Sequence, residues 1–310
     1  MTGLDIIGDV HGQAEELEAL LKKLGYELRA GSYRHPQRQT LFLGDLIDRG
    51  PHNRRVIALV RAMQEAGTAQ VIMGNHEYNA ICYHTEDPDT LQPFRAHNEK
   101  NTRQHASFLA EFGNDPDGLE DVLAWFRTLP LVLETSYYRA VHACWQPGRI
   151  DRLRQASASA TLTEEQIFRS VQKQTPEYDI VEDLLKGVEE PLPAGSVFYD
   201  KDGHQRDRIR VRWWKTSAES YREAAMLDAE TLANIPEVPF PEDRLAGYPT
   251  HAVPVFFGHY WLSGRPATMS QNAVCLDYSV GKPGGALCCY RFDGEKRLDE
   301  GKFVRVARER

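Results

Sequence analysis

Cysteine is scarce in this sequence and follows no recognisable spacing. Five cysteines occur, at positions 82, 144, 275, 288 and 289, and no two of them form a CxxC pair. An odd number without that spacing argues against a disulfide framework and gives no support for a structural zinc knuckle. A reducing compartment fits this usage best, so we expect a cytoplasmic protein.

Long apolar runs are also missing. No stretch approaches the roughly 20 apolar residues that a membrane-spanning helix needs. The opening residues, MTGLDIIGDVHG, do not join a basic segment to a long apolar core, as a signal peptide would. We therefore expect a soluble protein without a membrane partner.

Positive charge is not in surplus. The formal net charge is −8 at pH 7 and the sequence pI is about 5.8. A surface that neutralises many nucleic-acid phosphates needs a basic excess, so we expect no extended nucleic-acid-binding surface. Any phosphate-binding site must be local.

What the sequence does contain is a regular alternation of strand and helix patterns in its first third. Short apolar runs at residues 4–7, 40–43 and 69–73 predict buried strands. Between them, residues 14–25 and 54–67 carry apolar side chains at helical spacing. This order predicts a βαβαβ unit.

Each predicted strand ends in a polar cluster. The clusters are GDVHG at residues 8–12, GDLIDRG at 44–50 and GNHE at 74–77, and His142 and His259 follow two later apolar runs. Polar groups at the carboxyl ends of strands lie where open α/β sheets bind ligands. A mixed set of carboxylate, amide and imidazole donors suits a pair of transition metals better than magnesium alone. Such ions lie about 3.5–4 Å apart and need a ligand that touches both, which a carboxylate can be.

The set GDxHG, GDxxDRG and GNHE, followed by two isolated histidines, strongly resembles the phosphoprotein phosphatase branch of the calcineurin-like metallophosphoesterases. The resemblance is specific over residues 4–79 and extends to the two later histidines. It implies two divalent transition metal ions, with manganese favoured and iron or zinc as alternatives. It further implies that Asp45 bridges the ions, and it assigns six metal ligands: Asp9, His11, Asp45, Asn75, His142 and His259.

The resemblance also assigns residues to catalysis and to phosphate binding. His76 would donate a proton to the leaving oxygen, Asp48 would orient His76, and Arg49 would clamp the phosphoryl oxygens. Asn75 and His76 would also contact the substrate phosphate. A second arginine from the carboxyl-terminal half is typical of the family, and we assign this role to Arg212. Arg212 stands in a predicted strand at residues 208–212, where the alternative is a solvated face, and the following Trp213-Trp214 pair could stack a base or anchor a core.

The fold that the resemblance implies is α/β: a four-layer metallophosphoesterase sandwich, with two mixed β-sheets flanked by helices and a helical insertion. A doubly wound single sheet is the alternative. We predict one domain over residues 1–310, with helical insertions at about 78–129 and 156–235. The oligomeric state cannot be predicted.

The predicted function is metal-dependent hydrolysis of a phosphomonoester or phosphoanhydride, by direct attack of a hydroxide bound to both metals. The substrate partner would be a phosphoprotein or small phosphoester, as for serine/threonine phosphatases, or a dinucleoside polyphosphate, because the Gly258-His259 and DRG patterns resemble bacterial members of both kinds. Gly258 before His259 departs from the arginine-alanine-histidine arrangement of eukaryotic protein phosphatases. The net negative charge of the chain argues against a polynucleotide end phosphatase. An inactive metal-binding regulatory module is the alternative of another class, although none of the expected ligands is missing.

Overall fold

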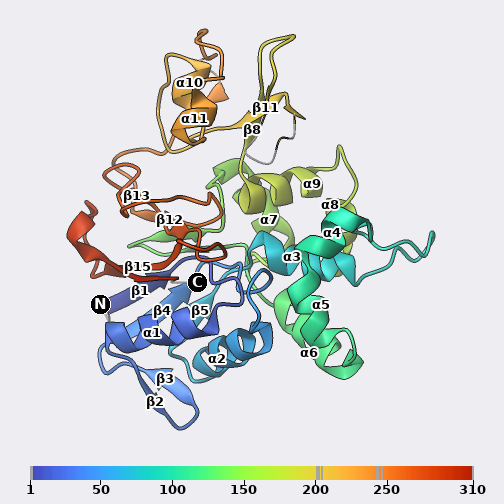
Figure 1. Cartoon of the computed structure of the whole chain (residues 1–310), viewed down its shortest axis with the longest axis vertical. Helices are drawn as coiled ribbons and strands as arrows, with labels where there is room; N and C mark the ends of the chain where they lie inside the picture. The colour runs from blue at the N-terminus through green and yellow to red at the C-terminus, as the bar shows by residue number, and fades with distance from the viewer. Residues whose placement is uncertain (1–2, 200–202, 204, 242–243, 246, 309–310) are drawn as a thin grey trace.

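The larger of two central sheets carries the βαβαβ unit (Figure 1). The computed structural model describes residues 3–199, 203, 205–241, 244–245 and 247–308. Six strands form this sheet in the order β14-β15-β1-β4-β5, with β16 paired to β15. Strands β1, β4 and β5 are parallel, whereas β15 runs antiparallel to β1. The strands are β1 (Gly3–Ile7), β4 (Arg38–Phe42), β5 (Ala69–Val71), β14 (Asp277–Tyr278), β15 (Ala286–Phe292) and β16 (Phe303–Ala307).

The second sheet has four strands in the order β13-β12-β7-β6. Strand β12 is parallel to both of its neighbours, and β6 pairs antiparallel with β7. Both sheets are therefore mixed, and the predicted sandwich is confirmed in place of one doubly wound sheet. The strands are β6 (Val132–Glu134), β7 (Arg139–Val141), β12 (Val255–Phe257) and β13 (Ala273–Cys275).

Alternating side chains place one apolar core between the two sheets and another on the outer faces. In β1, Leu4 and Ile6 join Phe256 of the second sheet in the inner core, while Ile7 belongs to the outer core. This follows from the period of two in a strand, which sends successive side chains to opposite faces. Burying both faces explains why the strands are short continuous apolar runs.

Two amphipathic helices cover the free face of the larger sheet: α1 (Ala14–Leu24) and α2 (Asn53–Glu65). Helix α1 buries leucines at helical spacing and ends at Gly25, whose φ of 92° lies in the left-handed region that glycine accepts at a helix end. The outer face of the second sheet packs against aromatic side chains. Trp213 and Trp214 lie 4.9 and 5.3 Å from the Phe257 ring, centroid to centroid. Of the two roles open to this tryptophan pair, the structure supports anchoring a core.

The segment from α3 to α6 is helical and lies beside the sheets (Figure 1). Its helices are α3 (Asn75–Tyr83), α4 (Glu99–Gln104), α5 (Ala106–Phe112) and α6 (Pro116–Arg127). Residues 156–235 contain helices together with short strand pairs, and the prediction of one domain with two helical insertions stays a prediction. The remaining helices are α7 (Pro147–Ala156), α8 (Glu164–Ser170), α9 (Pro176–Val181), the π-helix η1 (Glu182–Lys186), α10 (Tyr221–Ala224), α11 (Ala229–Leu232) and the 3₁₀-helix η3 (Glu300–Lys302).

The small strand pairs lie outside the two central sheets. They are β2 (Glu27–Arg29) with β3 (Ser32–Arg34), β8 (Glu189–Pro191) with β11 (Arg208–Arg210), and β9 (Phe198–Tyr199) with β10 (Gln205–Arg206). The predicted strand over residues 208–212 is thus shorter than expected.

All five cysteines are buried and carry free thiols. Within the described ranges, no helix is both long and apolar enough to cross a bilayer.

Candidate metal centre

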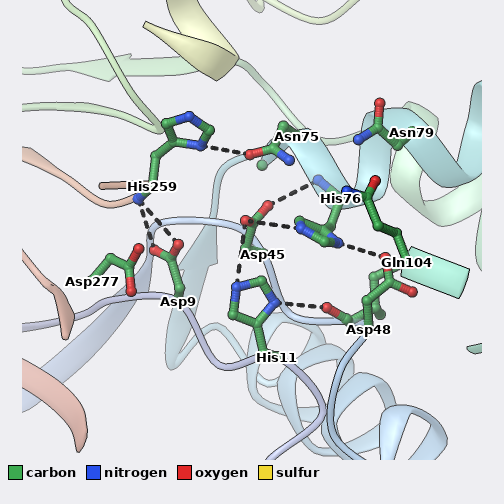
Figure 2. Close-up of polar contacts among 12 residues, drawn as sticks. Asp9, His11, Asp45, Asp48, Asn75, His76, Asn79, Gln104, His259 and Asp277 are labelled. Carbon is green, nitrogen blue, oxygen red and sulfur yellow. Dashed lines mark hydrogen bonds and ion pairs between the residues drawn. The ribbon is translucent and has the colours of Figure 1, made fainter. Parts of the chain in front are cut away.

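Five loops converge on one buried site between the two sheets (Figure 2). Three of them follow β1, β4 and β5 of the larger sheet, and two follow β7 and β12 of the second sheet. The carboxyl ends of these parallel strands meet at one edge, which is why residues more than 200 positions apart become neighbours. His259, for example, donates its backbone N–H to Asp9, with N···O distances of 3.0 and 3.3 Å.

The loops hold several of these side chains in a strained backbone conformation. A positive φ is uncommon for residues other than glycine and persists only where the surrounding structure enforces it. Among the predicted site residues, those with positive φ are His11 (49°), Asp45 (50°), Asp48 (69°), Arg49 (66°) and His259 (74°). Such strain is typical of functional sites.

Two glycines allow these loops to approach each other. A Cβ on Gly74 would lie 2.3 Å from both the backbone nitrogen and Oδ1 of Asp45, and one on Gly44 would lie 2.3 Å from the Gly74 nitrogen. No side chain fits in either place, because both contacts fall on backbone atoms or on a buried carboxylate. The glycines of GDLIDRG and GNHE therefore bring Asp45 against the start of α3.

Asp45 lies at the centre of the site, between two groups of metal-ligating side chains. The ligand atoms of His11, Asp45 and His76 lie within 4.8 Å of one another, and so do those of Asp45, His142 and His259. All five residues are buried. Asp45 thus belongs to both groups, with Oδ2 3.7 Å from His11 Nε2 and Oδ1 3.4 Å from His142 Nε2.

Backbone carbonyls fix the orientation of two of the histidines. His11 Nδ1 lies 3.0 Å from the Ile47 oxygen, and His142 Nδ1 lies 2.7 Å from the Leu43 oxygen. A carbonyl oxygen can only accept, so each Nδ1 carries the proton and donates it. In the neutral ring, Nε2 then directs a lone pair toward Asp45. Metal-binding histidines are commonly held in this way by a hydrogen bond from the other ring nitrogen.

Asn75 joins the second group through its amide oxygen. Asn75 Oδ1 lies 2.7 Å from His259 Nδ1 (Figure 2). The same oxygen lies 3.0 Å from His142 Nε2. Asp9 lies beside the backbone of residues 258–259 and next to Asp277, and it belongs to neither three-residue group. The structure therefore brings four of the other five predicted ligands around Asp45, with Asp9 at the margin of the cluster.

The charges and unpaired atoms of the cluster fit cations. Burial, together with the negative charges of Asp277 and Asp45, raises the pKa of Asp9 well above its usual range. Burial and the positive charge of His76 lower the pKa of His11 to about 3, and burial with Arg210 nearby lowers that of His259. For His142, burial lowers the pKa, but the negative charge of Asp45 outweighs it and raises the pKa to about 10. A bound cation would take the place of that proton, because imidazole binds metals in its neutral form. The Nε2 atoms of His11 and His259 are also buried without a hydrogen-bond partner. The residues present fit a two-metal centre.

His76 and Asp48 form a dyad beside the cluster. His76 Nδ1 lies 2.5 Å from Asp48 Oδ2, and its Nε2 faces the site, 3.8 Å from Asp45 Oδ2. Burial alone would lower the pKa of His76, but the charge of Asp45 and the hydrogen bond to Asp48 outweigh it and raise the pKa. His76 therefore holds a proton more readily than a free histidine.

The predicted phosphate-binding arginines differ in their placement. Arg49 is exposed, and its guanidinium carbon lies 4.3 Å from the Trp261 ring centroid, while Trp261 also stacks on His11 at 5.2 Å. Arg210 lines a cavity together with Trp261 and acts electrostatically on His259. No such contact with the described site residues is found for Arg212, whose assignment stays a prediction. The alternating pattern of residues 208–212 did not distinguish Arg210 from Arg212.

Sequence reasoning gave Glu77 no role, although it belongs to GNHE. This buried carboxylate accepts three backbone N–H groups, from Asp45 and Leu46 at 2.8 Å and from Gly74 at 2.9 Å. Burial and the nearby Asp45 raise the pKa of Glu77 to about 7. Its position in the motif, one turn inside a helix that starts at the site, was a signal that could have indicated this positioning role.

Comparison with known proteins gives the family. The family model for calcineurin-like phosphoesterases matches residues 4–193. The chain therefore belongs to the calcineurin-like phosphoesterase family.

Individual relatives match over shorter stretches. The chain is similar to asymmetrical bis(5'-nucleosyl)-tetraphosphatase PrpE of Halalkalibacterium halodurans, with 56% identity over 73 residues, which cover 23% of this chain and 30% of the relative. It is similar to PrpE of Bacillus subtilis at 44% identity over 73 residues, again 23% of this chain and 30% of the relative. The matched segment thus spans under a third of these relatives. Among solved structures, a protein serine/threonine phosphatase from Saccharomyces cerevisiae aligns with 14% identity and a TM-score of 0.49, covering 100% of this chain and 80% of that one.

Proposed function

We propose that the protein is a two-metal phosphoesterase that hydrolyses a phosphomonoester or phosphoanhydride in one direct displacement, without a covalent phosphoenzyme. The observation that carries the proposal is the position of Asp45, whose two carboxylate oxygens face separate groups of buried histidines. A shared carboxylate is what two closely spaced cations require.

The metals would be held by Asp9, His11 and Asp45 on one side and by Asp45, Asn75, His142 and His259 on the other. When bound, the two cations supply neutralisation of phosphoryl charge and activation of water. The mixed oxygen and imidazole donors favour manganese, with iron or zinc as alternatives. We further propose that the protein acts in the cytoplasm.

Arg49 is proposed to bind the phosphoryl oxygens. Its guanidinium is exposed beside the cluster and rests on Trp261, and a planar fork of donors matches a phosphate bidentately. Asn75 and His76 would contribute further contacts, and Arg212 and Arg210 are candidates for a second arginine. Each of these groups stabilises charge that grows on the transferring phosphoryl group.

His76 is proposed as the general acid. Its Nδ1 is engaged by Asp48, so the proton delivered to the leaving oxygen is the one on Nε2, which faces the site. Asp48 fixes the ring orientation and favours the protonated form. This assignment makes the rate sensitive to how much protonation the leaving group needs.

Two substrate classes are open to this site: a phosphoprotein or small phosphoester, and a dinucleoside polyphosphate. A cavity of about 720 Å³ borders Trp261, Lys282 and Arg305, and its size is typical of sites for small molecules. The Lys282 ammonium lies 4.4 Å from the Trp261 ring centroid. Cationic side chains in a cavity that borders the Trp261 ring, on which Arg49 rests, could bind the additional phosphates of a dinucleoside polyphosphate. This substrate class is therefore the second candidate, and it agrees with the names of the relatives that match part of the chain.

A panel of substrates tests the proposal. Purified protein supplied with manganese is expected to release phosphate from para-nitrophenyl phosphate, because the site needs only a phosphoryl group and a leaving oxygen. The same assay with phosphopeptides, nucleotides and dinucleoside polyphosphates would rank the two substrate classes by kcat/KM. If no phosphate compound is hydrolysed, the proposal fails and the regulatory metal-binding module is the better description.

A further inference from the structure

A third histidine, His105, contacts the dyad from the helical segment beside the sheets. It lies between α4 and α5, 57 positions after Asp48, and only 5% of its surface is exposed. His105 Nδ1 lies 2.8 Å from Asp48 Oδ1. Because an ionised carboxylate only accepts hydrogen bonds, His105 must be the donor.

The Asp48 carboxylate is therefore held at both oxygens. His76 engages Oδ2 at 2.5 Å, and His105 engages Oδ1 at 2.8 Å. With one oxygen free, the carboxylate could rotate about its terminal bond, since such torsions are broad. Two donors on opposite oxygens remove this freedom and fix the plane in which Asp48 meets the His76 ring.

His105 is itself held in place. Its Nε2 lies 3.3 Å from His84 Nε2, and its ring stacks on Phe108 at 4.6 Å with an interplanar angle of 18°. With Nδ1 of His105 donating to Asp48, its Nε2 is left to pair with His84, as the acceptor when the His105 ring is neutral. This contact holds the His105 ring in the orientation that Asp48 requires, and His84 stands at the end of α3, the helix that begins with the GNHE motif.

The backbone of Asp48 is anchored by the same part of the chain. Its N–H donates to Asn53 Oδ1 at 2.7 Å, and the backbone N–H and side-chain Nδ2 of Asn53 each donate to Glu111 of α5 at 2.6 Å. Asp48 has a φ of 69°, a strained conformation that needs such support. Residues 105–111 thus secure both the side chain and the backbone of Asp48.

We propose that His105 is a positioning residue for proton donation, and that the segment 105–111 serves to hold the Asp48–His76 dyad in its reactive geometry. His105 acts through Asp48 and does not touch the reacting atoms. The proposal rests on the proposed role of His76 as general acid. It gives this segment a part in catalysis, whereas the sequence predicted only that it belongs to a helical insertion at about 78–129.

His105→Leu and His105→Asn test this. Leucine removes the donor, while asparagine keeps an N–H at the position of Nδ1. A hydrogen bond to a charged group is worth roughly a 10- to 100-fold factor, so we expect His105→Leu to lower kcat on phosphoserine by about that much. Turnover of para-nitrophenyl phosphate, whose leaving group needs little protonation, should fall less than about threefold, and His105→Asn should restore most of the phosphoserine rate.

A control histidine, His97, lies just before α4. His97 stacks on Tyr83 at 3.9 Å and bonds to its backbone oxygen at 2.7 Å, without contacting Asp48. His97→Leu should leave the ratio of the two rates unchanged. If His105→Leu lowers the rate equally on both substrates and His105→Asn does not restore it, His105 has only a structural role. If the rates of His105→Leu are unchanged, His105 has no role in catalysis. Either result overturns the proposal.

A second readout does not depend on turnover. The Nδ1 proton of His76 in its short bond to Asp48 should give a downfield proton resonance in metal-free protein. That resonance should shift or broaden in His105→Leu and return in His105→Asn; an identical resonance in all three proteins overturns the proposal. If wild-type protein hydrolyses no phosphate compound, the proposed function fails. If His76→Asn shows the leaving-group selectivity and His105→Leu does not, only the present inference fails.

Discussion

His76→Asn is expected to lower kcat by roughly 10²–10⁴-fold on a substrate with a poor leaving group, the usual contribution of a general acid. The protein should keep its metal ions, because the dyad places Nδ1 of His76 on Asp48 and leaves Nε2 for the substrate. Asparagine retains polarity and removes the transferable proton. Elemental analysis alongside turnover would separate the two effects.

The size of this loss should depend on the leaving group. A serine alkoxide needs protonation as it departs, whereas a stabilised aryloxide needs little, so the defect should be large for phosphoserine and small for para-nitrophenyl phosphate. Asp48→Asn should show a milder form of the same selectivity. His251→Asn serves as the control, because His251 is exposed and precedes β12, whereas the site residue His259 follows that strand. His76 Nε2 also lies within reach of a ligand position, 3.8 Å from Asp45 Oδ2. Loss of a metal, or an equal loss of rate on both substrates, would make His76 a ligand or a phosphate-positioning residue.

Asp45→Asn is expected to lower metal content and turnover together, with the rate falling by roughly 10³-fold, equivalent to several kcal/mol of transition-state stabilisation. The reason is the shared position of Asp45, since losing one anionic ligand weakens both sites at once. Asp5→Asn is a matched control, because Asp5 is an equally buried aspartate in β1 that pairs with Arg38 and Arg291. Asp5→Asn should reduce stability and leave metal stoichiometry intact. Two tightly held ions and normal turnover in Asp45→Asn would show that Asp45 does not bridge.

The part of the site that follows β1, β4 and β5 could be predicted from the sequence because each motif directly follows a short apolar run. The βαβαβ order then places the three motifs at one sheet edge without further information. Predicted boundaries were close: the helix predicted over residues 54–67 is α2, Asn53–Glu65. The local sequence pattern was enough to predict these strands and helices, because the residues of each element specify it without long-range contacts.

The second half of the site depends on contacts that no local pattern specifies. His142 and His259 follow β7 and β12, which pair with each other although more than 100 residues separate them. Only the family resemblance connected these two histidines to the first three motifs. The role of His105 was even harder to predict from the sequence, because His105 follows no strand and belongs to no motif. Its contact with Asp48 exists only because the folded chain brings the start of α5 next to the Asp48 loop.

Metal content measured together with turnover tests the central claim most directly. Metal-free protein, prepared by chelation, would be titrated with manganese while bound metal and para-nitrophenyl phosphate hydrolysis are recorded on the same samples. The two-metal account predicts negligible turnover without metal and full turnover only when about two ions are bound per chain, in line with two ions sharing one carboxylate. Full turnover in the metal-free protein, or saturation of activity with a single bound ion, would contradict it.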